Sequence, residues 1–202
     1  MKLYYSPAAC SLSPHIVAME AGIPLEIEKV DLKAKKTEKG TDYWTINPKG
    51  YVPALDVGNG VMLTEGPAIV QYIADQKPDS GLAPKNGTME RYKLQEMLNF
   101  ITTEMHKTIG GLFNPAMQGE WREATLGLID RRLTAFDKMV EGKQYLMGDR
   151  FTVADAYAFT VLNWTRVHKL DLAKYPNIQA YFARVGERPK VREAMKAEGL
   201  AG

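Results

Sequence analysis

The stretch YYSPAACSLSPH, residues 4–15, lies where a short apolar strand passes into a helix, and it contains the chain's only cysteine. Upstream, KLYY (2–5) is rich in residues that favour strands. Downstream, PHIVAMEAG (14–22) is typical of a helix that has proline in its first turn and glycine as its stop signal. The sequence therefore predicts a strand-to-helix connection with Cys10 just before the N-terminus of a helix.

Cys10 and Ser13 have the spacing of a C-x-x-C redox motif whose second cysteine is replaced by serine. A helix N-terminus presents unpaired N–H groups and about half a positive charge, and both favour a thiolate. Without a second cysteine such a site cannot close its own disulfide, but it can form a mixed disulfide with an external thiol. A buried structural cysteine is the alternative interpretation of this position.

The first half of the chain continues with alternating strand and helix patterns. After the first helix, the patterns predict a strand at 26–30, a short helix or turn at 41–50, strands at 52–57 and 61–64, and a helix at 65–76. The two later strands flank Gly58-Asn59-Gly60, which is a strong hairpin signal. The order βαβ–α–ββα predicts a mixed sheet covered by helices.

The second half of the chain shows helical patterns and no strand pattern. The predicted helices are 88–109, 120–141, 152–169, 176–186 and 189–198. The polar run QKPDSGLAPKNG (76–87) separates the halves with several Gly and Pro turn signals. The sequence thus predicts an α/β domain at 1–80 followed by an all-α domain at 88–202.

Composition limits the classes of function. The chain has 202 residues, 45% of them hydrophobic and 25% charged, with a formal net charge of +2. These values are ordinary for a globular protein and give no case for a nucleic acid or a membrane as partner. One cysteine excludes an internal disulfide, which favours a cytoplasmic location. Three histidines and one cysteine give no pattern of metal ligands, so no metal is expected.

A second candidate site combines NPKGYVPAL (47–55) with TEGPAI (64–69). Proline donates no ladder hydrogen bond, so Val52-Pro53 at the start of a strand is unusual. A cis bond there, which about 5–6% of X-Pro pairs adopt, would leave the Val52 backbone able to pair with an extended peptide-like ligand. Glu65 beside the N–H groups of a helix start suits a ligand that carries an ammonium and a carboxylate. An ordinary capped helix is the alternative.

Together these segments resemble the glutathione transferases, specifically the bacterial beta class. The resemblance spans the whole chain and depends on five motifs in the family's order and spacing: YYSPAACSLSPH, NPKGYVPAL, LTEGPAIVQYIAD, LNFITTEMHK and FTVADAYAF. It implies a thioredoxin-like N-terminal domain that binds glutathione and an all-helical C-terminal domain. It also implies a homodimer. The Thr152-x-x-Asp155 capping box in the last motif implies a role in folding rather than chemistry.

The resemblance also assigns residues to the site. Cys10 and His106 match the two side chains beside the glutathione sulfur. The remaining glutathione contacts match Lys35, Val52, cis Pro53, Glu65, Gly66, Asn99, Glu104 and Lys107. Of these, the Val52 backbone matches the contact to the cysteinyl amide, and Glu65 with Gly66 matches the contact to the γ-glutamyl end. Lys35 and Lys107 match basic groups near the glycyl carboxylate and the thiol end, while Asn99 and Glu104 match residues that serve the partner subunit's site.

Three residues match the region that binds the hydrophobic co-substrate: Ile109, Phe113 and Trp164. Aromatic residues at such positions are more often part of a core. In other classes a serine follows the glutamate, where this chain has Gly66, and a sulfur-activating tyrosine stands where this chain has Tyr5. We interpret His15 as structural and Tyr5 as structural or secondary to Cys10 and His106, and the roles of Tyr5 and His168 stay open.

The resemblance implies an enzyme that conjugates the glutathione thiolate to small hydrophobic electrophiles, with additional Cys10-dependent thiol-disulfide exchange or peroxidase activity. Glutathione is then a co-substrate. Two alternatives stay open. One is a glutathione-dependent reductase or dehalogenase that acts through a Cys10 mixed disulfide, and the other is a non-catalytic binder of hydrophobic ligands. The sequence does not identify the electrophile.

Overall fold

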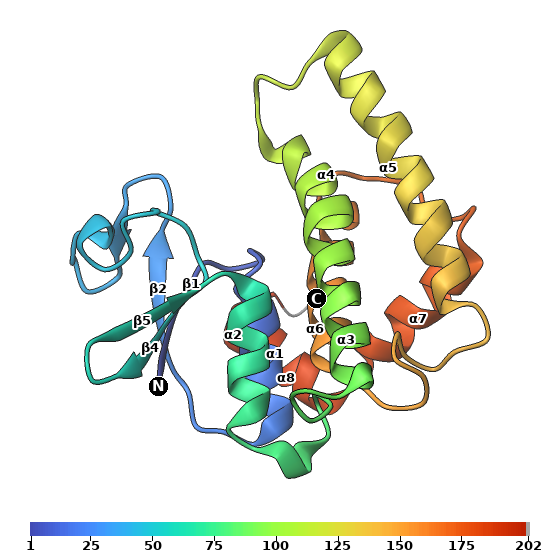
Figure 1. Ribbon diagram of the computed structural model, residues 1–202. Helices are drawn as coiled ribbons and strands as arrows, with labels where there is room; N and C mark the ends of the chain where they lie inside the picture. The colour runs from blue at the N-terminus through green and yellow to red at the C-terminus, as the bar shows by residue number, and fades with distance from the viewer. Residues whose placement is uncertain (201–202) are drawn as a thin grey trace. The chain divides into compact units, whose positions relative to one another are not determined.

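A five-stranded mixed sheet forms the centre of the N-terminal part of the chain in the computed structural model, which describes residues 1–200 (Figure 1). Its strands are β1 (Lys2–Tyr5), β2 (Glu26–Asp31), β3 (Lys36–Thr37), β4 (Ala54–Gly58) and β5 (Val61–Thr64), in the order β3-β2-β1-β4-β5. β1 and β2 are parallel, whereas β4 is antiparallel to β1 and to β5. This is the sheet of a thioredoxin-like domain, as predicted.

Two helices, α1 (Leu12–Ala21) and α2 (Gly66–Asp75), pack against each other beside this sheet (Figure 1). Most residues of α1 are buried, so this helix lies in the core and not at its edge. Gly22 ends α1 with φ +64, a left-handed conformation that glycine adopts at little cost. A short 3₁₀ turn, η1 (Tyr43–Thr45), leads into the loop before β4.

The last helix, α8 (Pro189–Ala197), packs on α1 and completes this N-terminal unit, Met1–Ala83 with Arg188–Gly202. Two contacts fix it. The Arg188 guanidinium donates two hydrogen bonds of 2.7 Å to the Glu20 carboxylate, and the buried His15 ring lies 3.0 Å from Glu198. The sequence prediction placed residues 188–202 in the helical domain. The structure assigns them to the N-terminal unit instead, because the apolar face of α8 is covered by α1; residues 201–202 lie outside the described part.

The helical unit is Pro84–Glu187. Its elements are α3 (Met89–Phe100), the π-helical segment η3 (Ile101–His106), α4 (Lys107–Gly110), α5 (Gly119–Val140), α6 (Val153–Val167) and α7 (Pro176–Gly186). Short 3₁₀ turns are η2 (Pro78–Ser80) in the connecting segment and η4 (Gly111–Phe113) after α4. Nearly all of α6 is buried, and it contacts α3, η3, α4 and α7. The helical unit therefore has α6 as its core.

Asp155 fixes the start of α6. Its carboxylate accepts hydrogen bonds from the backbone N–H groups of Thr152 and Leu146, each 2.8 Å, and from the Tyr181 hydroxyl at 2.9 Å. Burial raises the pKa of Asp155, and these hydrogen bonds oppose the rise. The predicted capping box is present. Through Leu146 and Tyr181, Asp155 also connects the start of α6 to the preceding loop and to α7.

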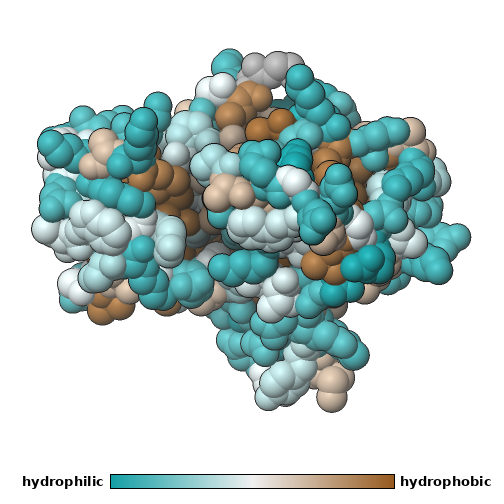
Figure 2. Space-filling model, turned by 90° about the horizontal axis from the view of Figure 1, so that it is seen from above, coloured by the Kyte–Doolittle hydropathy of each residue, from teal (hydrophilic) through white to brown (hydrophobic). Residues whose placement is uncertain are grey.

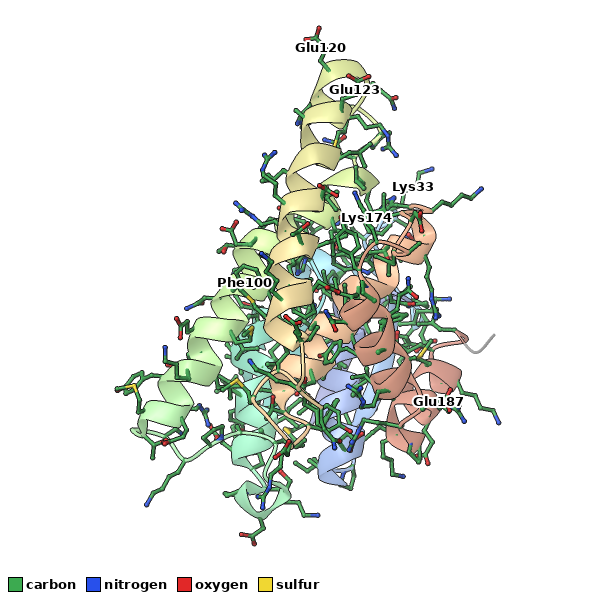
Figure 3. The ribbon with its side chains drawn as sticks, turned by 90° about the vertical axis from the view of Figure 1, so that its right-hand side faces the viewer. Lys33, Phe100, Glu120, Glu123, Lys174 and Glu187 are labelled. Carbon is green, nitrogen blue, oxygen red and sulfur yellow. The ribbon has the colours of Figure 1, made fainter. Side chains whose placement is uncertain are left out.

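The face drawn in Figure 2 is predominantly hydrophilic, with apolar side chains visible in smaller patches. Glu120 and Glu123 at the beginning of α5 point away from the protein (Figure 3), where carboxylates complement the positive end of a helix. Within residues 1–200, no helix is both long and apolar enough to cross a membrane.

The predicted fold class, an α/β thioredoxin-like domain with an all-α domain, is confirmed. The strands and helices lie within a few residues of the predicted ranges. Two features differ from the prediction. β3 is only two residues long, and the predicted helix 88–109 is interrupted by the π-helical segment, where the 3.6-residue period changes.

Candidate functional site

Cys10 lies in the connection between β1 and α1, partly exposed and outside any disulfide. Its thiol donates a hydrogen bond to the backbone carbonyl of Val52, 3.2 Å away. Buried Ser11 closes the preceding turn, because its hydroxyl donates to the Ser6 carbonyl and accepts from the Ser6 N–H. Ser13 stands where the second cysteine of a C-x-x-C motif would be, and its hydroxyl donates a hydrogen bond to the Cys10 carbonyl at 2.8 Å. The chain therefore folds back on both sides of Cys10 and holds it against Val52.

The Val52-Pro53 peptide bond is cis, as the resemblance implies. The Val52 side chain is buried in a small core with Tyr4, Tyr43 and Ala54. Among residues 1–200, no partner hydrogen-bonds to the Val52 backbone N–H, although the residue is only 6% exposed. A nearly buried, unpaired amide is costly unless a ligand pairs with it. This N–H is therefore a candidate donor to a peptide-like ligand beside the Cys10 thiol.

The loop before Val52 is fixed by two side chains that bind the Tyr51 carbonyl. The Tyr51 carbonyl accepts hydrogen bonds from the Tyr43 hydroxyl at 2.8 Å and from the Asn47 side-chain amide at 2.7 Å. Burial raises the pKa of Tyr43 to about 12, so its hydroxyl stays a donor at neutral pH. Gly50 has φ +67, and a Cβ there would lie 2.6 Å from the Trp44 ring. Only glycine fits this position without moving the ring.

Lys35 lies over the same loop. Its ammonium group donates to the Gly50 carbonyl at 2.7 Å and lies 5.4 Å from the Trp44 ring centre and 5.8 Å from that of Tyr51. Lys35 itself has a left-handed backbone, φ +54. The hydrogen bond and the two cation–π contacts fix this positive charge in place beside the loop.

Glu65 precedes α2 with φ +69, a strained conformation for a residue that carries a Cβ. Such strain persists where the surrounding structure imposes it, and it is concentrated at functional sites. The exposed carboxylate forms a 2.7 Å ion pair with Lys49, which also donates to Thr64. Gly66 is the first residue of α2, so its N–H belongs to the group that a helix start leaves without intrahelical partners.

The N-terminal unit thus gathers a thiol, a backbone amide, a carboxylate beside a helix N-terminus, and a fixed ammonium. The loop 47–52 links them: Lys35 binds it at one point, Lys49 connects it to Glu65, and Val52 ends it beside Cys10. These groups complement an extended peptide-like ligand that has a thiol, an ammonium and carboxylates.

In the helical unit, His106 is the last residue of η3. Its Nδ1 lies 2.6 Å from the Tyr157 hydroxyl, and its ring meets the Trp164 ring edge-on with 4.8 Å between centres. Gly110, one turn after His106, leaves space for the His106 and Trp164 rings. A Cβ at this position would lie 3.3 Å from Trp164 and 3.5 Å from the His106 ring. A π-helical segment often marks a functional position, because it breaks the regular spacing of side chains along a helix.

A row of aromatic rings continues from His106. Trp164 contacts Phe113 with 5.6 Å between ring centres, and Phe113 contacts His168 at 4.3 Å. Trp164 is buried, whereas Phe113 is 51% exposed and able to meet an apolar ligand. Burial, followed by the charge of Arg122, lowers the pKa of His168. The remaining predicted co-substrate residue, Ile109, is buried on α4.

The other predicted residues of the helical unit are Asn99, Glu104 and Lys107. Asn99 on α3 and Lys107 at the start of α4 are exposed. Glu104 is half-buried, and its carboxylate forms a 2.5 Å ion pair with Arg132 of α5. The sequence did not predict this internal partner, which orients Glu104 within its own chain.

The structure also adds residues that the sequence reasoning missed. Tyr43 and Asn47 hold the Tyr51 carbonyl, Lys49 pairs with Glu65, and Tyr157 contacts His106. Asn47 and Lys49 stand in the motif NPKGYVPAL, and Tyr157 stands in FTVADAYAF, but the sequence analysis gave none of these three residues a role and assigned the second motif to folding. In the part of the chain that the structure describes, no three His, Cys, Asp or Glu side chains form a group that could hold a metal ion.

Comparison with known proteins matches both halves of the chain to one family. Residues 8–76 match the model of the glutathione S-transferase N-terminal domain, and residues 100–189 match that of the C-terminal domain. The chain is 44% identical over 200 residues to the glutathione S-transferase GstA of Escherichia coli O157:H7, covering 99% of this chain and all of that protein.

Two solved structures extend the match to three dimensions. A beta class glutathione S-transferase from Sphingomonas chungbukensis is 47% identical, with a TM-score of 0.96 and full coverage of both chains. A sphingomonad glutathione S-transferase, solved as a complex with glutathione, is also 47% identical, with a TM-score of 0.95 and full coverage of both chains. At this identity the similarity extends beyond the fold to the family.

Proposed function

The chain belongs to the glutathione S-transferase family, in its bacterial beta class, and we propose that it conjugates glutathione to small hydrophobic electrophiles. Glutathione transferase activity and glutathione as co-substrate follow from the family. The assignment of residues to glutathione and the class of electrophile are our proposals.

The observation that carries the proposal is the Val52 backbone N–H, nearly buried and without a hydrogen-bond partner among residues 1–200, beside the Cys10 thiol. A cysteinyl residue in extended conformation would pair with this N–H and bring its sulfur toward Cys10. The sphingomonad relative was solved with glutathione bound, which supports a glutathione site in this chain.

The groups around Val52 fit the two ends of glutathione. Glu65, with its fixed strained backbone, would accept from the γ-glutamyl ammonium, and the N–H of Gly66 would donate to the adjacent carboxylate. Lys35 would attract the glycyl carboxylate, because its ammonium is held on the loop that ends at Val52. The resemblance also assigns Lys107 to glutathione, and it assigns Asn99 and Glu104 to the partner subunit's glutathione site.

In the proposed reaction the glutathione thiol loses its proton to solvent, and the thiolate sulfur attacks the electrophilic carbon. A carbon–sulfur bond forms while the leaving group departs with its bonding electrons. His106 stabilises the thiolate, and the α1 N-terminus beside Cys10 adds a positive field. Phe113, Trp164 and Ile109 would contact the hydrophobic co-substrate, with exposed Phe113 offering the largest accessible apolar area.

Cys10 supports a second activity, thiol-disulfide exchange. Its thiolate would attack a mixed disulfide of glutathione, release the other thiol and form a Cys10–glutathione disulfide. A second glutathione thiolate would then restore Cys10 and leave as oxidised glutathione. The specific observation is the partly exposed thiol, which is the only cysteine of the chain and has Ser13 where a resolving cysteine would be. Reductive dehalogenation and peroxide reduction would use the same mixed disulfide.

We also propose a homodimer and a cytoplasmic location. The polar residues Asn99 and Thr103 are exposed along the first helical stretch of the helical unit, which in the resemblance faces the partner. A single cysteine outside any disulfide suits a reducing compartment.

The test is a direct assay of the purified protein with glutathione and 1-chloro-2,4-dinitrobenzene, followed by the appearance of the conjugate. We expect turnover that saturates with glutathione and is absent with S-methylglutathione, whose sulfur cannot attack. A panel of alkyl halides, epoxides and mixed disulfides would follow. No glutathione-dependent turnover with any member would contradict the proposal.

A further inference from the structure

Tyr157 belongs to the motif FTVADAYAF and lies two residues after Asp155, the residue that fixes the start of α6. It is 1% exposed. Asp155 binds the Leu146 N–H and the Tyr181 hydroxyl, so the beginning of α6 is tied to the preceding loop and to α7. The Tyr157 hydroxyl therefore lies on a turn of α6 that several buried hydrogen bonds hold in place.

That hydroxyl lies 2.6 Å from Nδ1 of His106, a short hydrogen bond between groups 51 residues apart in the sequence. The His106 ring is also packed edge-on by Tyr157 and Trp164, with ring centres 5.8 and 4.8 Å away. Gly110 leaves the space that these rings occupy. The plane of the His106 ring is consequently fixed, and its Nδ1 is engaged by Tyr157.

The chemistry of the two groups decides where the proton lies. A neutral imidazole has one nitrogen that donates and one that accepts, and the hydrogen bond at one nitrogen determines the state of the other. A phenol O–H is a strong donor, and a phenol oxygen is a weak acceptor because its lone pair is delocalised into the ring. The favoured arrangement has the Tyr157 hydroxyl donating to Nδ1, with the ring proton on Nε2.

We propose that Tyr157 is a positioning residue, whose hydroxyl donates to Nδ1 of His106 and keeps the ring proton on Nε2. The consequence for catalysis depends on the proposed function: Nε2–H is then a hydrogen-bond donor toward the glutathione sulfur. A nitrogen that already carries a proton cannot remove one from the thiol. His106 therefore stabilises the thiolate and does not act as its base, and the motif FTVADAYAF serves catalysis as well as folding.

The direct test is nuclear magnetic resonance of protein labelled with ¹⁵N in histidine, without glutathione, at about pH 8.5, where an unperturbed imidazole is neutral. The chain has three histidines, so a His106→Gln sample identifies the His106 signals. We expect wild-type His106 to be protonated on Nε2 and Tyr157→Phe to give a mixture of both tautomers. A wild-type ring protonated on Nδ1, or an unchanged tautomer in Tyr157→Phe, would overturn the proposal.

Tyr181→Phe is the matched control. Tyr181 is equally buried and belongs to the same unit, and its hydroxyl donates to Asp155 and not to His106. Both variants remove one buried hydroxyl and leave the aromatic ring. Only Tyr157→Phe should shift the tautomer of His106.

Steady-state kinetics adds the functional readout. In Tyr157→Phe we expect kcat for conjugation to fall on the order of 10-fold, part of the ~10²-fold contribution of a positioned polar group. The KM for glutathione should stay within about twofold, because the hydroxyl orients His106 and does not bind the substrate. Equal kcat values in Tyr157→Phe and wild type would overturn the role in catalysis. Since the tautomer is measured without substrate, failure of the proposed function would appear separately, as an inactive wild type.

Discussion

The Cys10 thiol donates to the backbone carbonyl of Val52 at 3.2 Å, which joins the only cysteine of the chain to the residue before the cis proline. These residues are 42 positions apart in the sequence. The contact places a partly exposed sulfur next to a backbone amide that has no partner among residues 1–200.

Cys10 should carry glutathione as a mixed disulfide after incubation with oxidised glutathione. The partly exposed thiol can exchange, and no second cysteine can resolve the adduct. Intact-protein mass spectrometry before and after a reductant should detect one reducible glutathione per chain. A Cys10→Ser sample controls for non-covalent binding. The absence of any reducible adduct on the wild type would rule out the exchange activity.

Glu65→Gln should weaken glutathione binding by about 2 kcal/mol, or roughly thirtyfold in Kd, because a charged hydrogen bond to the ligand's ammonium is lost. The ion pair with Lys49 is exposed, so its loss should change stability little. Isothermal titration calorimetry measures the affinity.

Glu193→Gln is the control for this change, since Glu193 forms a similarly exposed 2.7 Å ion pair with Lys190 on α8. It should leave the affinity for glutathione unchanged. If Glu65→Gln and wild type bind glutathione equally well, the γ-glutamyl end does not lie at Glu65.

Tyr43 should make stability depend on pH above about pH 10. Burial raises its pKa to about 12, whereas an unfolded tyrosine titrates near 10. The folded state then keeps the proton longer, so the stabilising contribution is complete below about pH 10 and decreases as the pH rises toward 12. Relative to Tyr43→Phe, wild type should lose about 1 kcal/mol of unfolding free energy by pH 11.

Urea denaturation of wild type and Tyr43→Phe at pH 8 and pH 11 measures this difference. Comparing the two proteins removes the contribution of other groups that titrate in this range. A stability difference that is the same at both pH values would mean that the Tyr43 hydroxyl is not held as a donor to the Tyr51 carbonyl.

The protein should be a homodimer. Sedimentation velocity at micromolar concentration should give a species of twice the 22.6 kDa chain mass. Asn99→Ala and Glu104→Ala should then lower glutathione affinity only in the dimer, if they serve the partner subunit's site. A single 22.6 kDa species across the concentration range would reject the dimer.

Much of the fold could be predicted from sequence because its elements have strong local signals. Gly58-Asn59-Gly60 between apolar runs determined the hairpin β4–β5, and Thr152-x-x-Asp155 determined the start of α6. The position of α8 could not be predicted. A periodic pattern predicts that a helix has an apolar face, but it does not predict which other helix covers that face. The buried contact between His15 and Glu198 decides it, across 183 residues.

The candidate site could be predicted in part for similar reasons. Cys10, Val52 and Glu65 stand in motifs of local sequence, and the structure links their surroundings through the loop 47–52. Tyr157 was missed because its partner, His106, ends a π-helical segment whose side-chain spacing departs from the regular helical period. The Glu104–Arg132 ion pair was missed because contacts between helices depend on packing and not on spacing.

The rate at which Cys10→Ala conjugates glutathione to 1-chloro-2,4-dinitrobenzene shows whether the nucleophile is the glutathione thiolate or depends on Cys10. If the glutathione thiolate is the nucleophile, conjugation should remain measurable, because the α1 N-terminus and His106 are still present to stabilise it. The same variant should lose thiol-disulfide exchange almost completely, since that reaction needs the protein sulfur. Loss of conjugation in Cys10→Ala, with glutathione binding unchanged by calorimetry, would contradict the account and make Cys10 an obligatory participant in the conjugation step.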